Sequence, residues 1–283
     1  MTTLVFGRTG QLARELAAHE GVTCLGRDQA DLSDPEACAA AIRARAPAAV
    51  INAAAYTAVD KAEEEEALAT VINGEAPGAM ARACAELDIP FVTVSTDYVF
   101  GGSGAVPWQP GDAASPVNAY GRSKLRGEAL TCAAGGAYAV LRTSWVVSAH
   151  GHNFVKTMLR LGRERERLSI VADQVGAPTP ARDIAAACLE MARQLGADPR
   201  KAGIYHLAGA PETSWAGFAR EIFARAGVDC AVEDIPTSAY PTPAARPLNS
   251  RLDCTALETV FGLPQPDWRA GLKDILKDLG EVS

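Results

Sequence analysis

The sequence predicts an α/β fold, a doubly wound parallel sheet with a smaller C-terminal domain. Short apolar runs alternate with helical stretches through the first half, a glycine-rich turn follows the first run, and the second half is less regular. Strands that alternate with helices need crossover connections, so helices are expected on both faces of the sheet. A chain of 283 residues, 48% of them hydrophobic, can bury a core of this kind.

The first half supplies five expected strands. Residues 3–6 are an apolar run that ends in the turn GRTGQLA, and the helical stretch after it stops at Gly21. Further strands are expected at 22–25, 49–55, 90–96 and 137–146, and helical stretches at 34–47, at 60–89 and around Tyr120.

The second half contains helical patterns at 153–166, 182–196 and 214–227, apolar runs at 168–173 and 203–209, and a proline-rich loop at 235–250. We expect a dinucleotide-binding domain at 1–145, completed by segments within 180–210. Residues 146–283 are expected to form mainly a substrate-binding domain interleaved with the first.

Composition excludes several classes of protein. No run approaches the roughly 20 apolar residues of a membrane helix, so a soluble, cytoplasmic protein without a membrane partner is expected. The seven scattered cysteines indicate reduced structural thiols, and His150 and His152 lack further ligands at zinc spacing, so no metal site is assigned. A net charge of −7 argues against a nucleic-acid partner but leaves room for a local basic pocket.

The turn after the first strand predicts a Rossmann-type pyrophosphate site. Gly7 and Gly10 permit a tight turn and close backbone approach before a helix N-terminus, whose free amides attract an anion. Ala13 stands where the usual pattern has a third glycine. A plain strand-to-helix turn is the alternative, and the position of this turn at the first strand of an alternating pattern favours the nucleotide.

The end of the second strand normally reads the adenosine ribose. An acid there binds the NAD hydroxyls, whereas a cation binds the NADP phosphate. This chain has Arg27 followed by Asp28, with Arg8 in the glycine turn. The arginines are either phosphate ligands or two exposed side chains.

Tyr120 and Lys124 are four residues apart, so on a helix they project from one face. A phenol with an ordinary pKa of about 10 needs a neighbouring cation to act in proton transfer near neutrality, and Lys124 is placed to supply it and to bind a ribose hydroxyl. The hydroxyl of Thr96 is expected at a carbonyl oxygen. Such tyrosine and lysine pairs also occur on ordinary helix surfaces, but the order of turn, strand and helix favours catalysis.

Taken together, these motifs resemble the dTDP-4-dehydrorhamnose reductases, a family of extended short-chain dehydrogenase/reductases. The resemblance covers nearly the whole chain and rests on GRTGQLA, NAAAYTAVDKAE, VSTDYVFGG, YGRSKLRGE, RTSWV, NFVKTMLRL, DQVGAPT and YPTPAARPLNSRL. It implies reduction by NAD(P)H of the C4 ketone of dTDP-4-dehydro-6-deoxy-L-mannose to dTDP-L-rhamnose, a precursor of surface polysaccharide.

The resemblance also implies roles for individual residues. Tyr120 is the proton donor, Lys124 its electrostatic and ribose-binding partner, and Thr96 the hydroxyl that tunes the tyrosine. The implied cofactor contacts are Gly10, Gln11, Leu12, Asp31, Leu32, Ala54, Ala55 and Tyr56. The implied substrate contacts are Thr96, Asp97 and Trp145, although a tryptophan near a strand end often fills core space.

Some features depart from the family or stay open. The position where the family has an acid after the second strand is Gly26 in this chain. NADPH is the expected cofactor, and NADH stays open as the alternative. Tyr56 stands where relatives often have histidine. Mg²⁺ bound by glutamates at a subunit interface and a homodimer are compatible with the resemblance, but no ligands are assigned.

The substrate's pyrophosphate needs cationic partners, and Arg246, stiffened by Pro247, is the expected one, with Arg251 next. Pairing of Arg246 with a surface carboxylate is the alternative. Three other functions use the same scaffold. They are an NDP-sugar 4-epimerase, a dehydratase, which needs a pair of carboxylates after Thr96, and a non-catalytic regulatory subunit of methionine adenosyltransferase type.

Overall fold

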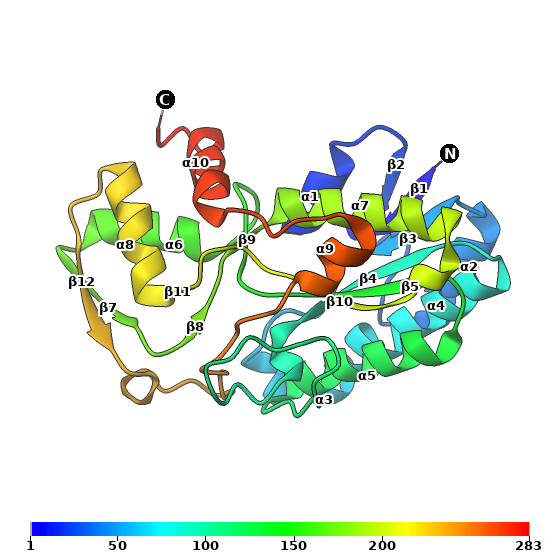
Figure 1. The fold of residues 1–283 in the computed structure, drawn as a ribbon, viewed down its shortest axis with the longest axis horizontal. Helices are drawn as coiled ribbons and strands as arrows, with labels where there is room; N and C mark the ends of the chain where they lie inside the picture. Colours follow the sequence, from blue (N-terminus) through cyan, green and yellow to red (C-terminus); the bar gives the residue numbers. More distant parts are fainter. Residues whose placement is uncertain (1, 283) are drawn as a thin grey trace.

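The computed structural model describes residues 2–282 and confirms the predicted fold class. Six parallel strands form the main sheet in the order β10-β5-β4-β3-β1-β2 (Figure 1). Their bounds are β1 Thr3–Phe6, β2 Val22–Leu25, β3 Ala49–Asn52, β4 Phe91–Thr96, β5 Tyr138–Thr143 and β10 Gly203–Leu207. The chain moves outward from β1 to β2 and then returns to β3 on the other side of β1. This reversal opens a crevice at the carboxyl ends of β1 and β3, where such sheets bind ligands.

Helices cover both faces of the sheet (Figure 1). On one face lie α1 (Gln11–Ala17), α7 (Ala181–Ala197) and α9 (Thr255–Phe261), whose apolar side chains share a core with the sheet. On the other lie α2 (Pro35–Arg45), α4 (Ala76–Glu86) and α5 (Ala119–Ala134). From the later half of the chain, β10 forms one edge of this sheet and α7 packs on one of its faces.

The stretch predicted as helical at 60–89 is divided into several pieces. A 3₁₀ turn at Lys61–Glu63, α3 (Glu66–Thr70) and a π turn at Val71–Glu75 precede α4. The π turn contains Asn73, which is buried and bonded to neighbouring elements. Single π turns of this kind often occur at functional sites.

The smaller lobe has its own core. It consists of α6 (Phe154–Glu164), α8 (Trp215–Ala226) and α10 (Trp268–Asp278) beside two paired strands, β7 (Arg167–Val171) and β12 (Ala231–Ile235). Two pairs of two-residue strands lie in the segments around this lobe. β6 (Val146–Val147) pairs with β9 (Thr179–Pro180), and β8 (Val175–Gly176) pairs with β11 (Thr213–Ser214). The helical patterns at 153–166, 182–196 and 214–227 are confirmed as α6, α7 and α8, whereas β12, α9 and α10 were not predicted.

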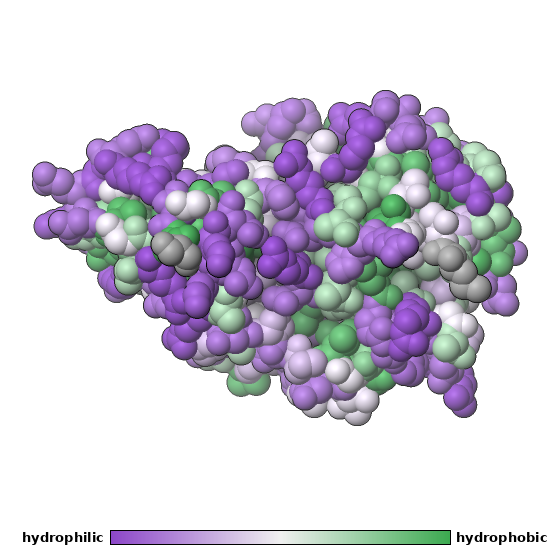
Figure 2. Space-filling model, turned by 90° about the horizontal axis from the view of Figure 1, so that it is seen from above, coloured by the Kyte–Doolittle hydropathy of each residue, from purple (hydrophilic) through white to green (hydrophobic). Residues whose placement is uncertain are grey.

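Hydrophilic residues cover much of the face seen in Figure 2, with smaller apolar areas between them. No helix within residues 2–282 combines the length and the apolar character needed to cross a membrane.

Helix α5 begins unusually close to the end of β4. Asn118 caps it by accepting a hydrogen bond from the Gly121 amide at 2.8 Å. A Cβ atom added at Gly121 would lie 2.2 Å from the carbonyl oxygen of Tyr98, which is backbone and cannot easily move away. Glycine at this position therefore sets how near the helix comes to the 3₁₀ turn Asp97–Val99 that follows β4.

We predict that Gly121→Ala destabilises the fold by about 1–3 kcal/mol or more, because the new methyl group overlaps the Tyr98 carbonyl. Gly111→Ala is the matched control, since a Cβ atom there meets nothing within 4 Å. Urea denaturation of both variants measures the difference. Equal stability of the two variants would contradict the tight approach.

Candidate active site

A cleft of about 980 Å³ lies at the carboxyl ends of the central strands. Its walls come from the glycine turn after β1, the end of β2, the segment after β3, the end of β4, the start of α5 and the segment after β5. All the residues predicted for the cofactor and for catalysis line it: Gly7, Gly10, Gln11, Leu12, Arg27, Asp31, Leu32, Ala54, Ala55, Tyr56, Thr96, Tyr120 and Lys124. Sequence positions more than 110 residues apart thus meet in one cavity.

The glycine turn has the geometry of a phosphate cradle. Gly7 has φ +118°, a conformation that side chains disfavour, and a Cβ atom there would touch Ala13 and the backbone after β3 at 3.4 Å. Gly10 stands at the N-cap of α1 without a side-chain cap, and space beside it is open. The first amides of α1 are thus left for an anion. Gln11, in contrast, uses its side chain to bond Val146, Ser148 and Asn153, so it joins α1 to the smaller lobe.

Two arginines, Arg8 and Arg27, line the cleft near the end of β2. Arg8 pairs with Asp28 at 3.0 Å, and Arg27 lies 4.0 Å from Asp31, with its side chain 81% exposed. Exposed ion pairs of this kind contribute little to stability, so both guanidinium groups are free to exchange a carboxylate for a phosphate.

The segment after β3 is held by a residue that the sequence did not reveal. The Asn73 amide accepts from the Tyr56 backbone N–H at 2.8 Å and donates to the Tyr56 carbonyl at 3.0 Å. It also donates to the Ser123 hydroxyl on α5 at 2.9 Å. The Tyr56 phenol donates to Glu65 at 2.7 Å. Asn73 thereby fixes the floor of the cleft relative to α5.

The three predicted catalytic side chains lie together, but not with the contacts that their spacing suggested. The Lys124 ammonium group donates to the Val94 carbonyl of β4 at 2.6 Å rather than to the phenol of Tyr120. Thr96 donates to the Asp97 carboxylate at 3.1 Å and accepts from the Tyr98 backbone N–H at 3.2 Å. The ring of Tyr120 packs edge-on against Tyr98, with centroids 5.6 Å apart.

Burial dominates the protonation of these groups. It raises the pKa of Tyr120 to about 12, with a smaller rise from the Asp97 charge and a partial offset from the Thr96 hydroxyl. It lowers the pKa of Lys124 to about 8, against the opposing charge of Glu128. It raises the pKa of Asp97 to about 6, against hydrogen bonds that include Thr96. At neutral pH the phenol holds its proton, as it would at the ordinary tyrosine pKa of about 10, and can act as a donor.

The family to which these motifs belong follows from comparison with known proteins. The family described as "RmlD substrate binding domain" matches residues 1–281. The dTDP-4-dehydrorhamnose reductase of Burkholderia thailandensis is 48% identical over 295 aligned residues, with 99% of each chain covered. The chain belongs to the dTDP-4-dehydrorhamnose reductase family.

Solved structures of the family have the same fold. A reductase of Clostridium acetobutylicum superimposes with a TM-score of 0.93 at 35% identity, covering 99% of this chain and 100% of the other. A reductase of Bacillus anthracis, in complex with NADP, gives a TM-score of 0.90 at 33% identity, with 98% and 100% covered. The family resemblance inferred from the motifs is thus confirmed over the whole chain.

The residues predicted to bind the substrate differ from one another in burial and in their contacts. Asp97 lines the cleft, is 2% exposed, and its Oδ2 atom has no hydrogen-bond partner in the described part of the chain. Trp145 also lines the cleft and stacks on Trp215, a residue the sequence did not single out. Arg246 pairs with Asp60 at 2.8 Å, and Arg251 pairs with Glu212. In this structure Arg246 is thus paired with a carboxylate, which was the alternative to its predicted role as a pyrophosphate ligand.

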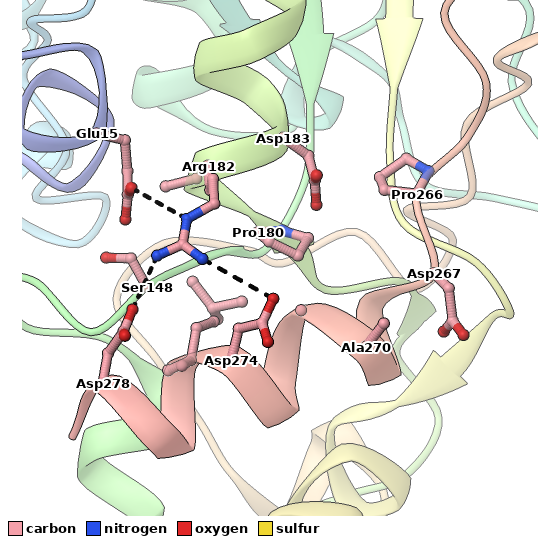
Figure 3. Close-up of a pocket in the computed structure, with 14 residues that line it drawn as sticks. Glu15, Ser148, Pro180, Arg182, Asp183, Pro266, Asp267, Ala270, Asp274 and Asp278 are labelled. Atoms are coloured by element: carbon pink, nitrogen blue, oxygen red, sulfur yellow. Dashed lines mark hydrogen bonds and ion pairs between the residues drawn. The ribbon is translucent and has the colours of Figure 1, made fainter. Parts of the chain in front are cut away.

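A second, smaller cavity of about 230 Å³ lies where α1, α7 and α10 meet (Figure 3). The Arg182 guanidinium points between three carboxylates, 2.9 Å from Asp278, 3.7 Å from Glu15 and 3.8 Å from Asp274. This ion-pair cluster connects the two lobes. Within residues 2–282 no three or more His, Cys, Asp or Glu side chains are arranged to hold a metal ion, and magnesium has no assigned place.

Beneath the catalytic residues, α5 is attached to the sheet by a buried ion pair. Glu128, one turn after Lys124, accepts two hydrogen bonds from Arg142 of β5, at 2.9 and 2.6 Å, and both side chains are 3% exposed. Ser95, next to Thr96, also donates to Glu128. Burial and the Arg142 charge lower the pKa of His206 to about 3, so its neutral ring donates to a carbonyl and accepts from Arg142.

We predict that Arg142→Met destabilises the protein by about 3–5 kcal/mol, because it leaves the Glu128 carboxylate buried and unpaired. The double variant Glu128→Leu/Arg142→Met should recover most of this loss, since no uncompensated charge remains. Arg43→Met is the control, as Arg43 and Glu86 form an exposed pair at 2.8 Å. Urea denaturation gives the three values, and a double variant as unstable as Arg142→Met would disprove the charge argument.

Proposed function

We propose that this reductase transfers hydride from NADPH to the C4 ketone of dTDP-4-dehydro-6-deoxy-L-mannose and so forms dTDP-L-rhamnose. The observation that carries the proposal is the meeting of Thr96, Tyr120 and Lys124 in one cleft with the glycine turn. Membership of the reductase family identifies the substrate class.

The cleft fits the cofactor that the family implies. The tight turn at Gly7 and the open space beside Gly10 leave room for a pyrophosphate against the first amides of α1, and Arg8 and Arg27 border the ribose position. The Bacillus anthracis relative is described in complex with NADP. When bound, the dinucleotide supplies the hydride, and the arginines are the basis for choosing NADPH over NADH.

The chain's own residues manage the proton and the oxygen. The Thr96 hydroxyl hydrogen-bonds the ketone oxygen, and the protonated phenol of Tyr120 donates its proton as negative charge develops there. Lys124 donates hydrogen bonds to the ribose hydroxyls and places a positive charge near Tyr120. For this it exchanges its bond to the Val94 carbonyl for one to the ligand.

Three residues are proposed for the sugar nucleotide. The unpartnered Oδ2 of Asp97 accepts a sugar hydroxyl, which would satisfy a buried acceptor. The Trp145 indole forms an apolar wall of the cleft. Arg246 grips the pyrophosphate if it releases Asp60, since a guanidinium exchanges carboxylate for phosphate in similar geometry.

We further propose a cytoplasmic enzyme, because all seven cysteines are free, as is usual in a reducing compartment. A homodimer is the proposed assembly, and light scattering tests it.

The activity is tested by following NAD(P)H oxidation in a spectrophotometer after addition of the dTDP-4-keto sugar. Substrate-dependent oxidation with stoichiometric dTDP-L-rhamnose supports the proposal. A 4-epimerase would instead carry tightly bound NAD and turn over without added cofactor. Absence of oxidation with both NADPH and NADH would reject the reductase.

Tyr120→Phe should lower kcat by about 10² to 10⁴-fold, because only the transferable proton is lost. NADPH affinity and thermal stability should stay near those of the parent protein. Steady-state kinetics measure kcat, fluorescence titration measures NADPH affinity, and thermal denaturation measures stability. A variant with parental kcat would remove Tyr120 from the mechanism.

The pH profile should report Lys124. Its pKa of about 8 means that it is charged below that pH and neutral above it, so kcat/KM should fall as pH rises through about 8. Lys124→Met should lower kcat/KM and abolish this alkaline limb. A parental profile that stays flat up to the ordinary lysine pKa of about 10.4 would refute the assignment.

Cofactor choice should depend on Arg27. Arg27→Ala removes a cation from the adenosine end, so the Michaelis constant for NADPH should rise by about tenfold while that for NADH changes little. Arg8→Ala is the companion variant that ranks the two arginines. Equal effects of Arg27→Ala on both cofactors would exclude it as the selector.

A further inference from the structure

Trp145 has an unusual backbone. Its φ is +47°, in the left-handed region that large side chains rarely adopt, two residues after the end of β5 at Thr143. Its carbonyl accepts a hydrogen bond from the Thr179 amide at 3.1 Å. A strained residue of this kind persists only where its surroundings hold it, and such residues gather at functional sites.

The indole of Trp215 packs flat against that of Trp145. Their ring centroids are 3.7 Å apart and their planes differ by 16°. Gly176 leaves room for the edge of the Trp145 ring, since a Cβ atom there would lie 3.2 Å from Cε2. The stack and the glycine together define one orientation for the Trp145 indole.

Trp215 is itself fixed by the smaller lobe. It is the first residue of α8, and its Nε1 donates to the Gln174 side chain at 3.2 Å. Gln174 in turn donates to the Thr237 hydroxyl at 3.1 Å, at the start of the proline-rich loop. Phe154 packs on Trp215 with centroids 4.6 Å apart. The smaller lobe thus supports a residue of the larger one across the cleft.

We infer that Trp215 is a positioning residue, which holds the strained Trp145 indole as a wall of the sugar site and thereby determines affinity for the sugar nucleotide. Both indoles line the same cleft as Thr96 and Tyr120. A planar apolar wall suits the apolar face of a deoxy sugar ring. The inference rests on the proposed function, and it adds that Trp215 of the smaller lobe holds Trp145 in place.

The test compares steady-state kinetics of Trp215→Ala and Trp215→Phe. The alanine variant should raise the Michaelis constant for the dTDP-4-keto sugar by about tenfold, with a smaller change in kcat and an unchanged dissociation constant for NADPH. The phenylalanine variant, which keeps a flat ring, should restore most of the affinity. Trp268→Phe is the control, because Trp268 is 2% exposed in the same lobe's core and does not line the cleft.

A double-mutant cycle shows whether Trp215 acts through Trp145. In a Trp145→Ala background, Trp215→Ala should cause little further loss, because the residue it positions is gone. The inference would be overturned if the losses in affinity from Trp145→Ala and Trp215→Ala were additive. It would also be overturned if Trp215→Ala left the Michaelis constant for the sugar nucleotide unchanged, or if Trp268→Phe raised that constant as much as Trp215→Ala. If the parent protein is active and any of these results is found, only this inference is rejected. If the parent protein is inactive, the proposed function is rejected and the inference with it.

Discussion

The placement of helix α5 against β4 and β5 is the constraint on which the rest of the site depends. Gly121 brings the start of the helix to the Tyr98 carbonyl, and Glu128 attaches its second half to Arg142. A buried ion pair is costly when one partner is missing and specific in geometry when both are present. The two contacts together determine where Tyr120 and Lys124 stand relative to the end of β4.

The same close packing sets the charges in the cleft. Excluding water disfavours every charged form, so the pKa of Tyr120 and of Asp97 rises and that of Lys124 falls. A protonated phenol is the form that donates to a developing alkoxide, and Tyr120 keeps this form at neutral pH with or without the shift. The packing of α5 therefore sets both the position of the acid and the electrostatics around it.

Local patterns in the sequence predicted the elements that local physics decides. The alternation of apolar runs and helical stretches, the glycines at 7 and 10, and the spacing of Tyr120 and Lys124 all place residues within a few positions of one another. The residues that were missed act over long separations. Asn73 reaches Ser123, and Trp215 reaches Trp145. Gln11 was predicted as a cofactor contact, but its bond to Asn153, 142 positions away, was not. No periodicity in a single sequence encodes such pairings.

The expected bond between Lys124 and Tyr120 illustrates the same limit. Helical spacing places two side chains on one face, but it does not decide which acceptor a flexible ammonium group reaches, and here the Val94 carbonyl of β4 is that acceptor. Arg246 likewise meets Asp60, 186 positions away. The fold class and the cleft were predictable from the sequence, whereas the individual polar contacts required the tertiary structure.

The most direct test of the central claim is to follow the transferred hydrogen. NADPH carrying deuterium on the transferred face of its nicotinamide would be oxidised with dTDP-4-dehydro-6-deoxy-L-mannose, and the sugar product examined by NMR. The account predicts deuterium at C4 of dTDP-L-rhamnose, with the hydroxyl proton drawn from solvent through Tyr120. Deuterium that stays on the cofactor, or appears at another carbon of the sugar, would contradict it.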